Sequence, residues 1–491
     1  MIDCTLMSGD NEGRVPYKWV VATVFVIGMF MDTMDVTVVN VALPTLGKQF
    51  HAGTSTIEWV VVGYLLSLAV WIPASGWIGD RIGTKKVFLF ALASFTLASA
   101  ACGQARTLHQ LIAFRILQGV GGGMLTPVGT AMLFRAFKPQ ERAQASTVLL
   151  IPTVLAPAVG PIIGGFLIDT LSWRWVFYIN LPAGVIGFFV GLRWLREHTE
   201  PTAGRFDVPG FLLSGAGLAC VLYALSEAPS LGWASPSVAG LGFVGVALFV
   251  GLVVVELRTQ EPMLDLRLYR DRMFRSASAV MIMLFGGFIG VLFLMPLLLQ
   301  GDNLFRLSPL QSGLTTFPQA VGMILSTQVA GRVYHRVGPR RLVVGGVLGF
   351  ALTSCGFLLV ELSTSLWWVR GILFLRGITM AFAFVPLQAA SYANIRSADT
   401  GRASALYSTQ RQVAAALGVA LVATVLASRT KALTAHVTGA ALVAQRQVSA
   451  FHDAFAAAIV VAFAAAVVAL MIRDSDAAAS IRQPSAKSVP A

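Results

Sequence analysis

The chain has 491 residues, of which 56% are hydrophobic and 12% are charged, whereas soluble globular proteins carry about 25% charged residues. Fourteen membrane-spanning helices of about 20 residues each would need ~280 residues, or ~57% of the chain, which matches the apolar fraction. This composition excludes a soluble enzyme, a nucleic-acid-binding protein and a disordered scaffold, although the formal net charge is +13. Cysteines and histidines are scattered without paired spacing, so neither a disulfide framework nor a metal site is predicted.

Apolar stretches long enough to cross a bilayer recur fourteen times. The first follows a polar segment that ends at Lys18, and it is longer than the core of a signal peptide, so we expect a retained span. Glycine and proline do not interrupt these stretches, because membrane helices tolerate both. The predicted spans are 19–43, 57–77, 87–105, 108–133, 143–168, 174–194, 209–227, 237–257, 274–299, 311–334, 341–361, 366–390, 402–427 and 451–472.

The distribution of Lys and Arg predicts the orientation, because cytoplasmic loops of membrane proteins are enriched in these residues. With the N-terminus in the cytoplasm, the two tails and the even-numbered loops hold 25 of the 36 Lys and Arg residues, and the other side holds seven. Both termini are therefore predicted to be cytoplasmic. The same basic residues are expected to meet anionic lipid head groups. Segment 428–450 is expected to be an ordinary outer loop, with contact to a periplasmic or cell-wall partner as the alternative.

Two short basic segments indicate an internal repeat. GWIGDRIGTKK (Gly76–Lys86) follows the second span and GRVYHRVGPRR (Gly331–Arg341) follows the tenth, at a constant offset of 255 residues. We therefore predict an all-α polytopic membrane protein with two six-helix halves, related by a parallel pseudo-repeat, and two inserted central helices. Transporters that rock two halves about a midplane site have this organisation. The predicted division is a cytoplasmic tail 1–18, a six-helix half 19–196, a two-helix insertion 197–258, a six-helix half 259–473 and a cytoplasmic tail 474–491.

Five segments together resemble the major facilitator superfamily. GWIGDRIGTKK is similar to its signature loop, FRILQGVGGG (Phe114–Gly123) to its span-4 motif, and APAVGPIIGG (Ala156–Gly165) to its span-5 antiporter motif. MDVTVVNVALP (Met34–Pro44) and WRWVFYINLPAG (Trp173–Gly184) resemble the drug–proton antiporter branch with fourteen spans. Two residues depart from the pattern. Ala156 stands where the antiporter motif usually begins with glycine, and His335 replaces, in the second half, the acid found at Asp80.

Three charged residues inside spans are candidates for proton coupling. An unpaired charge at mid-membrane costs at least ~2.5–3.5 kcal/mol. At 1.5 Å per residue, Asp35 of the first span and Arg115 of the fourth lie about 12 Å and about 10 Å from the same membrane surface, so we predict an ion pair. A pair that one proton can break is a coupling device, and the resemblance implies the same role; a static pair that locks two helices is the alternative. Asp32 shares a helical face with Asp35, and three roles stay open for it: proton carrier, substrate-facing acid or helix-interface residue.

The fourth and fifth spans carry small residues, and the fifth also carries prolines that can kink a helix. Gln118 and Gly119 stand at i+3 and i+4 from Arg115, so one helix face presents a charge, an amide and bare backbone. The fifth span carries the motif residues Pro157, Gly160, Pro161, Gly164 and Gly165. Glycine allows close approach of a neighbouring helix, and the resemblance implies an interface between halves that seals the outward side. Plain packing, or a kink without further role, is the alternative.

The basic segment after the second span is expected to be a cytoplasmic gating loop, a latch that holds the outward-open state. Its residues are predicted to be Gly76, Asp80, Arg81, Gly83, Lys85 and Lys86. Asp80 can cap a helix or pair with a cation across the interface between halves. Topogenic charge alone accounts for the basic residues but not for Asp80.

Six residues of the spans are candidates for lining a central cavity. Arg376 lies ten residues into the twelfth span, too deep for easy snorkelling, so we expect it to face the central cavity and to meet a substrate anion or an acid of the first half. The candidate set is Tyr64, Trp71, Phe293, Gln319, Arg376 and Gln388. Packing or an interfacial position is the alternative for each aromatic residue.

The function that these features predict is a proton-coupled antiporter. It would export amphipathic small molecules, such as drugs, toxic cations or secondary metabolites, across the cytoplasmic membrane of a bacterium by alternating access. No enzyme, cofactor or metal is expected, and the proton gradient supplies about 2.3 kcal/mol per charge per 100 mV. Expected partners are a small-molecule substrate, protons and membrane lipids, with no nucleic acid, and the chain is expected to be a monomer. Export of lipids or lipid conjugates is the alternative, followed by a proton-coupled nutrient importer, which the antiporter motif disfavours.

Overall fold

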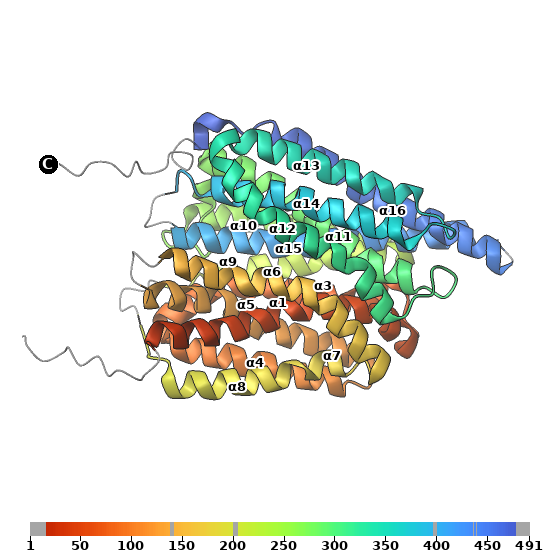
Figure 1. Cartoon of the computed structure of the whole chain (residues 1–491). Coiled ribbons are helices and arrows are strands. Elements are labelled where there is room, and N and C mark those ends of the chain that lie inside the picture. The colour runs from red at the N-terminus through yellow and green to blue at the C-terminus, as the bar shows by residue number, and fades with distance from the viewer. Residues whose placement is uncertain are drawn as a thin grey trace, which may run out of the picture.

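The computed structural model describes residues 16–137, 142–199, 205–395, 400–435, 437 and 439–477. Within these ranges the regular structure is entirely helical, and long helices lie side by side in one bundle (Figure 1). Helices from the first half form one side of the bundle and helices from the second half form the other. The predicted all-α polytopic class is confirmed.

The helices follow the chain order that the sequence predicts. The first half contains α1 (Tyr17–Phe50), α2 (Thr54–Ile57), α3 (Trp59–Ile82), α4 (Thr84–Gln104), α5 (Leu108–Ala136), α6 (Arg142–Thr170), α7 (Trp175–Tyr178) and α8 (Asn180–Trp194). The inserted pair is α9 (Val208–Leu231) and α10 (Pro236–Arg258). The second half contains η2 (Leu266–Arg270), α11 (Arg272–Gln300), α12 (Pro309–Val337), α13 (Pro339–Cys355), η3 (Gly356–Leu359), α14 (Leu366–Ser391), α15 (Thr400–Thr434), α16 (Ala440–Ala469) and η5 (Asp474–Ala477).

Short polar side chains set several helix starts. Thr107 accepts a hydrogen bond from Gln110 N at the start of α5, and Asp271 accepts one from Phe274 N at the start of α11. Ser308 forms a capping box at the start of α12. These oxygens satisfy backbone N–H groups that have no partner inside the helix.

Among the described residues, twelve helical stretches are long and apolar enough to cross a membrane. Two further helices, α6 and α12, have 29 residues each and stand where the fifth and tenth spans are expected. They pack against each other, and α12 is less apolar because Ser, Thr and Gln recur in its first half. A helix therefore occupies every expected position, while fourteen crossings remain a prediction.

Helix ends differ by several residues from the predicted spans in a number of places, and two differences change the arrangement of the helices. The sixth span is divided at Ile179 into α7 and α8. The expected outer loop 428–450 is wrong for most of its length, because α15 continues to Thr434 and α16 begins at Ala440. This stretch is rich in alanine and other good helix formers, and Arg429 pairs with Asp453 at 2.6 Å across the two helices. In Figure 1, the joined ends of α15 and α16 extend beyond the rest of the bundle.

We call the end of the bundle where α1 begins and α3 ends the basic face, and the other end the opposite face. Two loops on the basic face show the internal repeat. Gly83, between α3 and α4, has φ +118°, and Gly338, between α12 and α13, has φ +85°, a region that L side chains rarely adopt. Glu197 then accepts backbone N–H groups at the start of α4, and Asp474 accepts one at the start of α13. Each half thus caps its third long helix with an acid that follows its last helix.

At the opposite face the two halves are in direct contact. Gln300 Nε2 of α11 donates to the carbonyl of Val41 in α1 at 3.0 Å. Lys48 Nζ pairs with Asp302 at 2.5 Å. Asp169, near the end of α6, accepts the hydroxyl and backbone N–H groups at the start of α12 at 2.8 and 2.9 Å. This face of the bundle is therefore closed.

Candidate functional site

The predicted ion pair between Asp35 and Arg115 is confirmed. The Arg115 side chain of α5 is 1% exposed and the Asp35 side chain of α1 is 0% exposed. Arg115 Nη1 donates to Asp35 Oδ2 and to Gln118 Oε1, and Nε donates to the carbonyl of Val60 in α3 at 2.9 Å. The pair therefore joins three helices in the interior of the first half.

The second oxygen of Asp35 is also fully engaged. Gln118 Nε2 donates to Asp35 Oδ1 at 2.9 Å, and Asn180 Nδ2 of α8 donates to the same oxygen at 3.3 Å. Asn180 also donates to Ser99 Oγ of α4 at 3.1 Å. Neither Asn180 nor Ser99 is among the site residues predicted from the sequence. The available signal was a lone amide inside the quoted segment WRWVFYINLPAG.

Tyr64 of α3 joins this network to the second acid. Its hydroxyl donates to Asp32 Oδ1, and Thr126 Oγ1 donates to Asp32 Oδ2 at 3.4 Å. The Arg115 guanidinium lies 4.1 Å from the centre of the Tyr64 ring, within the range of a cation–π contact. Asp35 is buried and Asp32 is partly exposed. One tyrosine therefore contacts the cation of the buried pair with its ring and the more accessible acid with its hydroxyl.

Two glycines of α5 make room for this arrangement. A Cβ on Gly122 would lie 2.7 Å from Tyr64 Oη and 2.9 Å from Asp32 Oδ1. A Cβ on Gly119 would lie 2.5 Å from Ser67 Cβ in α3. The bare backbone predicted on this face of the fourth span is thus what lets α3 and α5 approach.

A cation from the second half reaches the same acid. Arg411 of α15 is near enough to Asp32 for their opposite charges to interact. Its guanidinium carbon lies 5.6 Å from the centre of the Phe285 ring, and its Nε has no hydrogen-bond partner among the described residues. Asp32 therefore accepts a hydrogen bond from a hydroxyl of its own half and is also attracted by a positive charge of the other half.

The prediction for Arg376 was wrong. This side chain is 0% exposed inside the second half, so it faces no cavity and meets no acid of the first half. It donates to Ser354 Oγ at 3.1 Å, to Gln319 Oε1 at 3.2 Å and to the carbonyl of Gly287 at 3.3 Å. Its guanidinium also lies 4.3 Å from the centre of the Phe350 ring. Neutral acceptors and an aromatic face replace the expected carboxylate.

This arrangement repeats the first-half network without its acids. At the offset of 255 residues that relates the two basic loops, Gln319 corresponds to Tyr64 and Ser354 to Ser99. At the same offset Gly287 and Gly290 stand at the positions of Asp32 and Asp35. Arg376, like Arg115, belongs to the fourth long helix of its half. The buried cation is therefore present in both halves, and the titratable partners are present only in the first.

The span-5 motif lies at the crossing of α6 with α1 and α12. A Cβ on Gly160 would collide with Thr37 of α1. A Cβ on Gly165 would lie 2.5 Å from Leu310 Cα and 2.5 Å from the carbonyl oxygen of Pro309. On the facing helix, Gly313 approaches the Pro161 backbone as closely. Gly164 lies against Val38, and Pro157 is half-buried one turn before Pro161. The motif thus forms a contact between halves near the closed opposite face.

The predicted gating loop is wrong as a loop, because its residues before Gly83 lie in α3 and those after it lie in α4, so that Gly83 alone forms the turn. The predicted gating residues make their contacts inside the first half. Asp80 pairs with Arg135 of α5 at 3.1 Å. In this conformation its cation therefore comes from its own half and not from across the interface between the halves. Lys85 Nζ donates to the carbonyl of Leu192 at 2.9 Å, and the backbone of Lys85 and Lys86 donates to Glu197. Arg81 is exposed, and Gly76 has open space around it.

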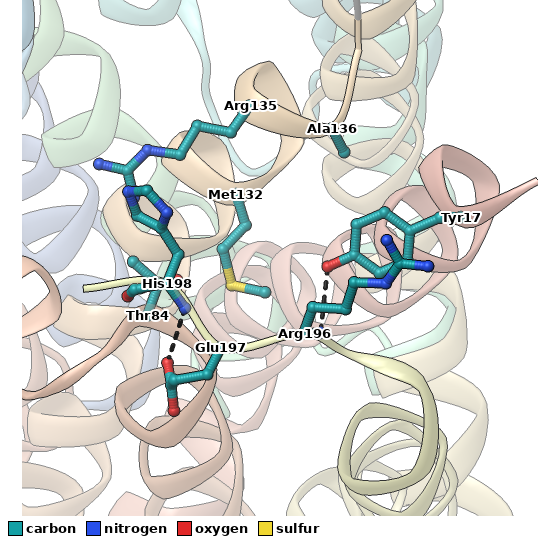
Figure 2. A pocket seen from close by; sticks show the side chains of 8 residues that line it. All are labelled: Tyr17, Thr84, Met132, Arg135, Ala136, Arg196, Glu197 and His198. Atoms are coloured by element: carbon teal, nitrogen blue, oxygen red, sulfur yellow. Dashed lines mark hydrogen bonds between the residues drawn. The ribbon is translucent and has the colours of Figure 1, made fainter. Parts of the chain in front are cut away.

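A pocket at the basic face lies beside this loop (Figure 2). The backbone N–H of Arg196 donates to Tyr17 Oη at 3.1 Å, and its guanidinium lies 4.7 Å from the centre of the Tyr17 ring. The lining residues are Tyr17, Thr84, Met132, Arg135, Ala136, Arg196, Glu197 and His198. The pocket contains no member of the Asp35 network. Its contacts fix the segment after α8 against the start of α4.

The other predicted cavity residues do not gather at one site. Tyr64 belongs to the buried network above and is 0% exposed, as is Phe293. Trp71 packs on Phe211 of the inserted helix α9, with ring centres 5.2 Å apart. Gln319 binds Arg376, and Gln388 is exposed.

Two related halves of long helices meet at one closed face, and the first half holds a buried ion pair. This is the architecture of a polytopic membrane transporter. The profile of the Major Facilitator Superfamily matches residues 25–419, and the chain belongs to this family. The sequence-based assignment to this family is therefore confirmed.

Curated relatives cover most of the chain. The Multidrug resistance protein B homolog of Mycobacterium tuberculosis is 35% identical over 409 residues, which are 82% of this chain and 75% of that protein. The Putative multidrug resistance protein MdtD of Serratia proteamaculans is 32% identical over 84% of each chain. The Uncharacterized MFS-type transporter YhcA of Bacillus subtilis is 31% identical over 86% of this chain and 79% of that protein.

Solved structures share the fold. A bacterial homologue of the human lysosomal transporter Spinster, in an inward-facing and unoccupied conformation, aligns with a TM-score of 0.67 at 15% identity, covering 96% of this chain and 100% of that one. A POT family transporter in complex with 5-aminolevulinic acid aligns with a TM-score of 0.65 at 15% identity, covering 91% and 94%. At this identity the similarity concerns the fold alone.

Proposed function

We propose that the chain is a proton-coupled antiporter that exports amphipathic small molecules, such as drugs, toxic cations or secondary metabolites. The observation that carries the proposal is the buried Asp35–Arg115 pair and its link to Asp32 through Tyr64. Relatives at 32–35% identity that bear multidrug resistance names support this class of substrate.

Protonation of Asp35 is the coupling event in this proposal. The proton removes the negative charge beside Arg115, and the cation then keeps neutral partners, among them Gln118, the Val60 carbonyl and the Tyr64 ring. A buried cation without its anion is costly, so the first half must rearrange around α1 and α5. The C-terminal half, whose Arg376 has neutral partners, does not respond to the same proton.

In this proposal Asp32 is the acid that contacts the substrate or transfers the proton. It is more exposed than Asp35, and the Arg411 charge of the second half acts on it. A cationic substrate beside Asp32 would replace part of that attraction. Binding at this point would therefore change the interaction between the two halves, which alternating access requires.

We place the basic face in the cytoplasm, with both termini on that side of a bacterial inner membrane, because positive residues concentrate in cytoplasmic loops. The closed opposite face is then the outer face of the transporter. The proton gradient is the energy source, no cofactor takes part, and the working unit is a monomer in contact with membrane lipids.

Ethidium accumulation in a pump-deficient bacterial host tests the proposal. The wild-type chain is expected to lower accumulation, a protonophore to abolish the effect, and Asp35→Asn to be inactive at equal expression. Asp453→Asn, a partly exposed acid paired with Arg429 far from the network, is the matched control and is expected to stay active. If the wild-type chain changes nothing, broad drug export is wrong. If Asp35→Asn is as active as the control, the coupling role of this acid is wrong.

A further inference from the structure

A second buried carboxyl lies at the opposite face, at the residue that joins α2 to α3. The Glu58 side chain is 0% exposed. Ser226 Oγ of the inserted helix α9 donates to Glu58 Oε1, and Oε2 is buried without a hydrogen-bond partner among the described residues. Half of this carboxyl group is therefore unsatisfied.

The charges around Glu58 do not compensate a carboxylate. No Lys, Arg or His in the described part of the chain forms an ion pair with it, and the charge that acts on it is that of Glu227 in α9. At the outer ends of neighbouring helices, Lys48 of α1 pairs with Asp302 and Arg429 of α15 pairs with Asp453. His51 at the end of α1, His109 of α5 and Lys431 of α15 are exposed, and α4 brings no charged residue to this end. A buried anion without a cation is disfavoured, whereas the neutral acid is tolerated.

The preceding residue of α9 is held by the other half. Thr424 Oγ1 of α15 donates to the carbonyl of Leu225 at 2.7 Å, while Ser226 holds Glu58 of the first half. Consecutive residues of one inserted helix therefore contact both halves at the closed face. When the halves separate there, α9 cannot keep both hydrogen bonds. Because α9 packs more extensively on α15 than on α3, we expect it to stay with the second half, and the loss of its contact with α3 then exposes Glu58 to water.

We propose that Glu58 is a proton-binding site that couples external pH to closure of the opposite face. One proton passes from the outer solution to the carboxylate as the face closes, and the carboxyl returns that proton to the outer solution as the face opens. The site therefore biases the conformational equilibrium without carrying a proton across the membrane. This inference relies on the proposed function for alternating access and for the orientation in the membrane, and it does not depend on Asp35 or on the cargo.

The sign of the effect follows from linkage. An exposed glutamate is ionised above about pH 5, so closure then requires uptake of one proton. The ratio of closed to open molecules is expected to fall about tenfold per pH unit above that value. Acid outside favours the closed opposite face, and alkali favours the open one.

The test measures the distance across the opposite face by double electron–electron resonance. Spin labels are placed at Leu171→Cys and Leu362→Cys, two exposed positions of the two halves, in a background without native cysteines. Asp35→Asn is included so that the first protonation site is silent. The open population of this parent is expected to rise with pH, and Glu58→Gln is expected to stay closed at every pH.

Two further variants keep the test decisive. Glu227→Gln, the neighbouring acid, is expected to retain the titration. Thr424→Val breaks the hydrogen bond of α9 to the second half without touching Glu58, so it is expected to increase the open population at all pH values and to keep the titration. Identical titration of Glu58→Gln and the parent, or a parent whose distance does not respond to pH, would overturn the proposal. Either result is independent of ethidium export.

Discussion

Substitution of Gly165 by alanine provides a direct test of the α6–α12 contact. The added Cβ would lie 2.5 Å from both Leu310 Cα and the Pro309 carbonyl oxygen, which are backbone atoms that no rotamer change can move. Carbon atoms in ordinary contact are about 3.5–4.0 Å apart, so α6 and α12 must separate by about 1 Å. Overpacking of this kind costs about 1–3 kcal/mol. Because only the closed state contains this contact, the ratio of closed to open molecules should fall about 5- to 150-fold.

The assay is the rate at which a short bifunctional thiol reagent links Lys48→Cys to Asp302→Cys. These side chains meet across the two halves in the closed state, and their surface ion pair contributes little to stability. Gly331→Ala on α12 is the matched control, because no atom lies within 4 Å of its added Cβ. Gly165→Ala is expected to slow cross-linking at least fivefold, and the control is expected to match the parent. Equal rates for both variants would refute the argument that this crossing limits closure.

Three further predictions concern the network and the caps. Gly122→Ala places a methyl group against the hydroxyl of Tyr64, so proton-driven export should fall at unchanged expression, and normal export would contradict the network. Glu197→Ala removes the cap of α4 and should cost about 1 kcal/mol, seen as a lower Tm with the fold retained; an unchanged Tm would contradict the capping role. Arg376→Lys should lower Tm but leave the pH profile of export unchanged. Arg115→Lys, in contrast, should shift that profile. A shifted profile with Arg376→Lys would show that both halves respond to protons.

The class of the protein and the central ion pair of the candidate site can both be predicted from the sequence. Its apolar stretches predict each of the long helices, since spanning length and hydropathy are properties of contiguous residues. The depth comparison predicts the contact of Asp35 with Arg115, because rise per residue is fixed in a helix. The repeat of the basic loops is readable from Gly83 and Gly338, whose left-handed backbone conformation favours glycine.

Which helix faces meet could not be predicted from the sequence and is seen in the tertiary structure. Asn180 reaches Asp35, Asp80 pairs within its own half, and Arg376 has neutral acceptors, since each partner comes from a distant helix whose rotation the sequence does not state. Glu58 gave no signal in the chain, because its burial depends on the inserted helix α9 lying across it. Periodicity and depth are local properties of a helix, whereas burial and pairing depend on how all the helices pack together.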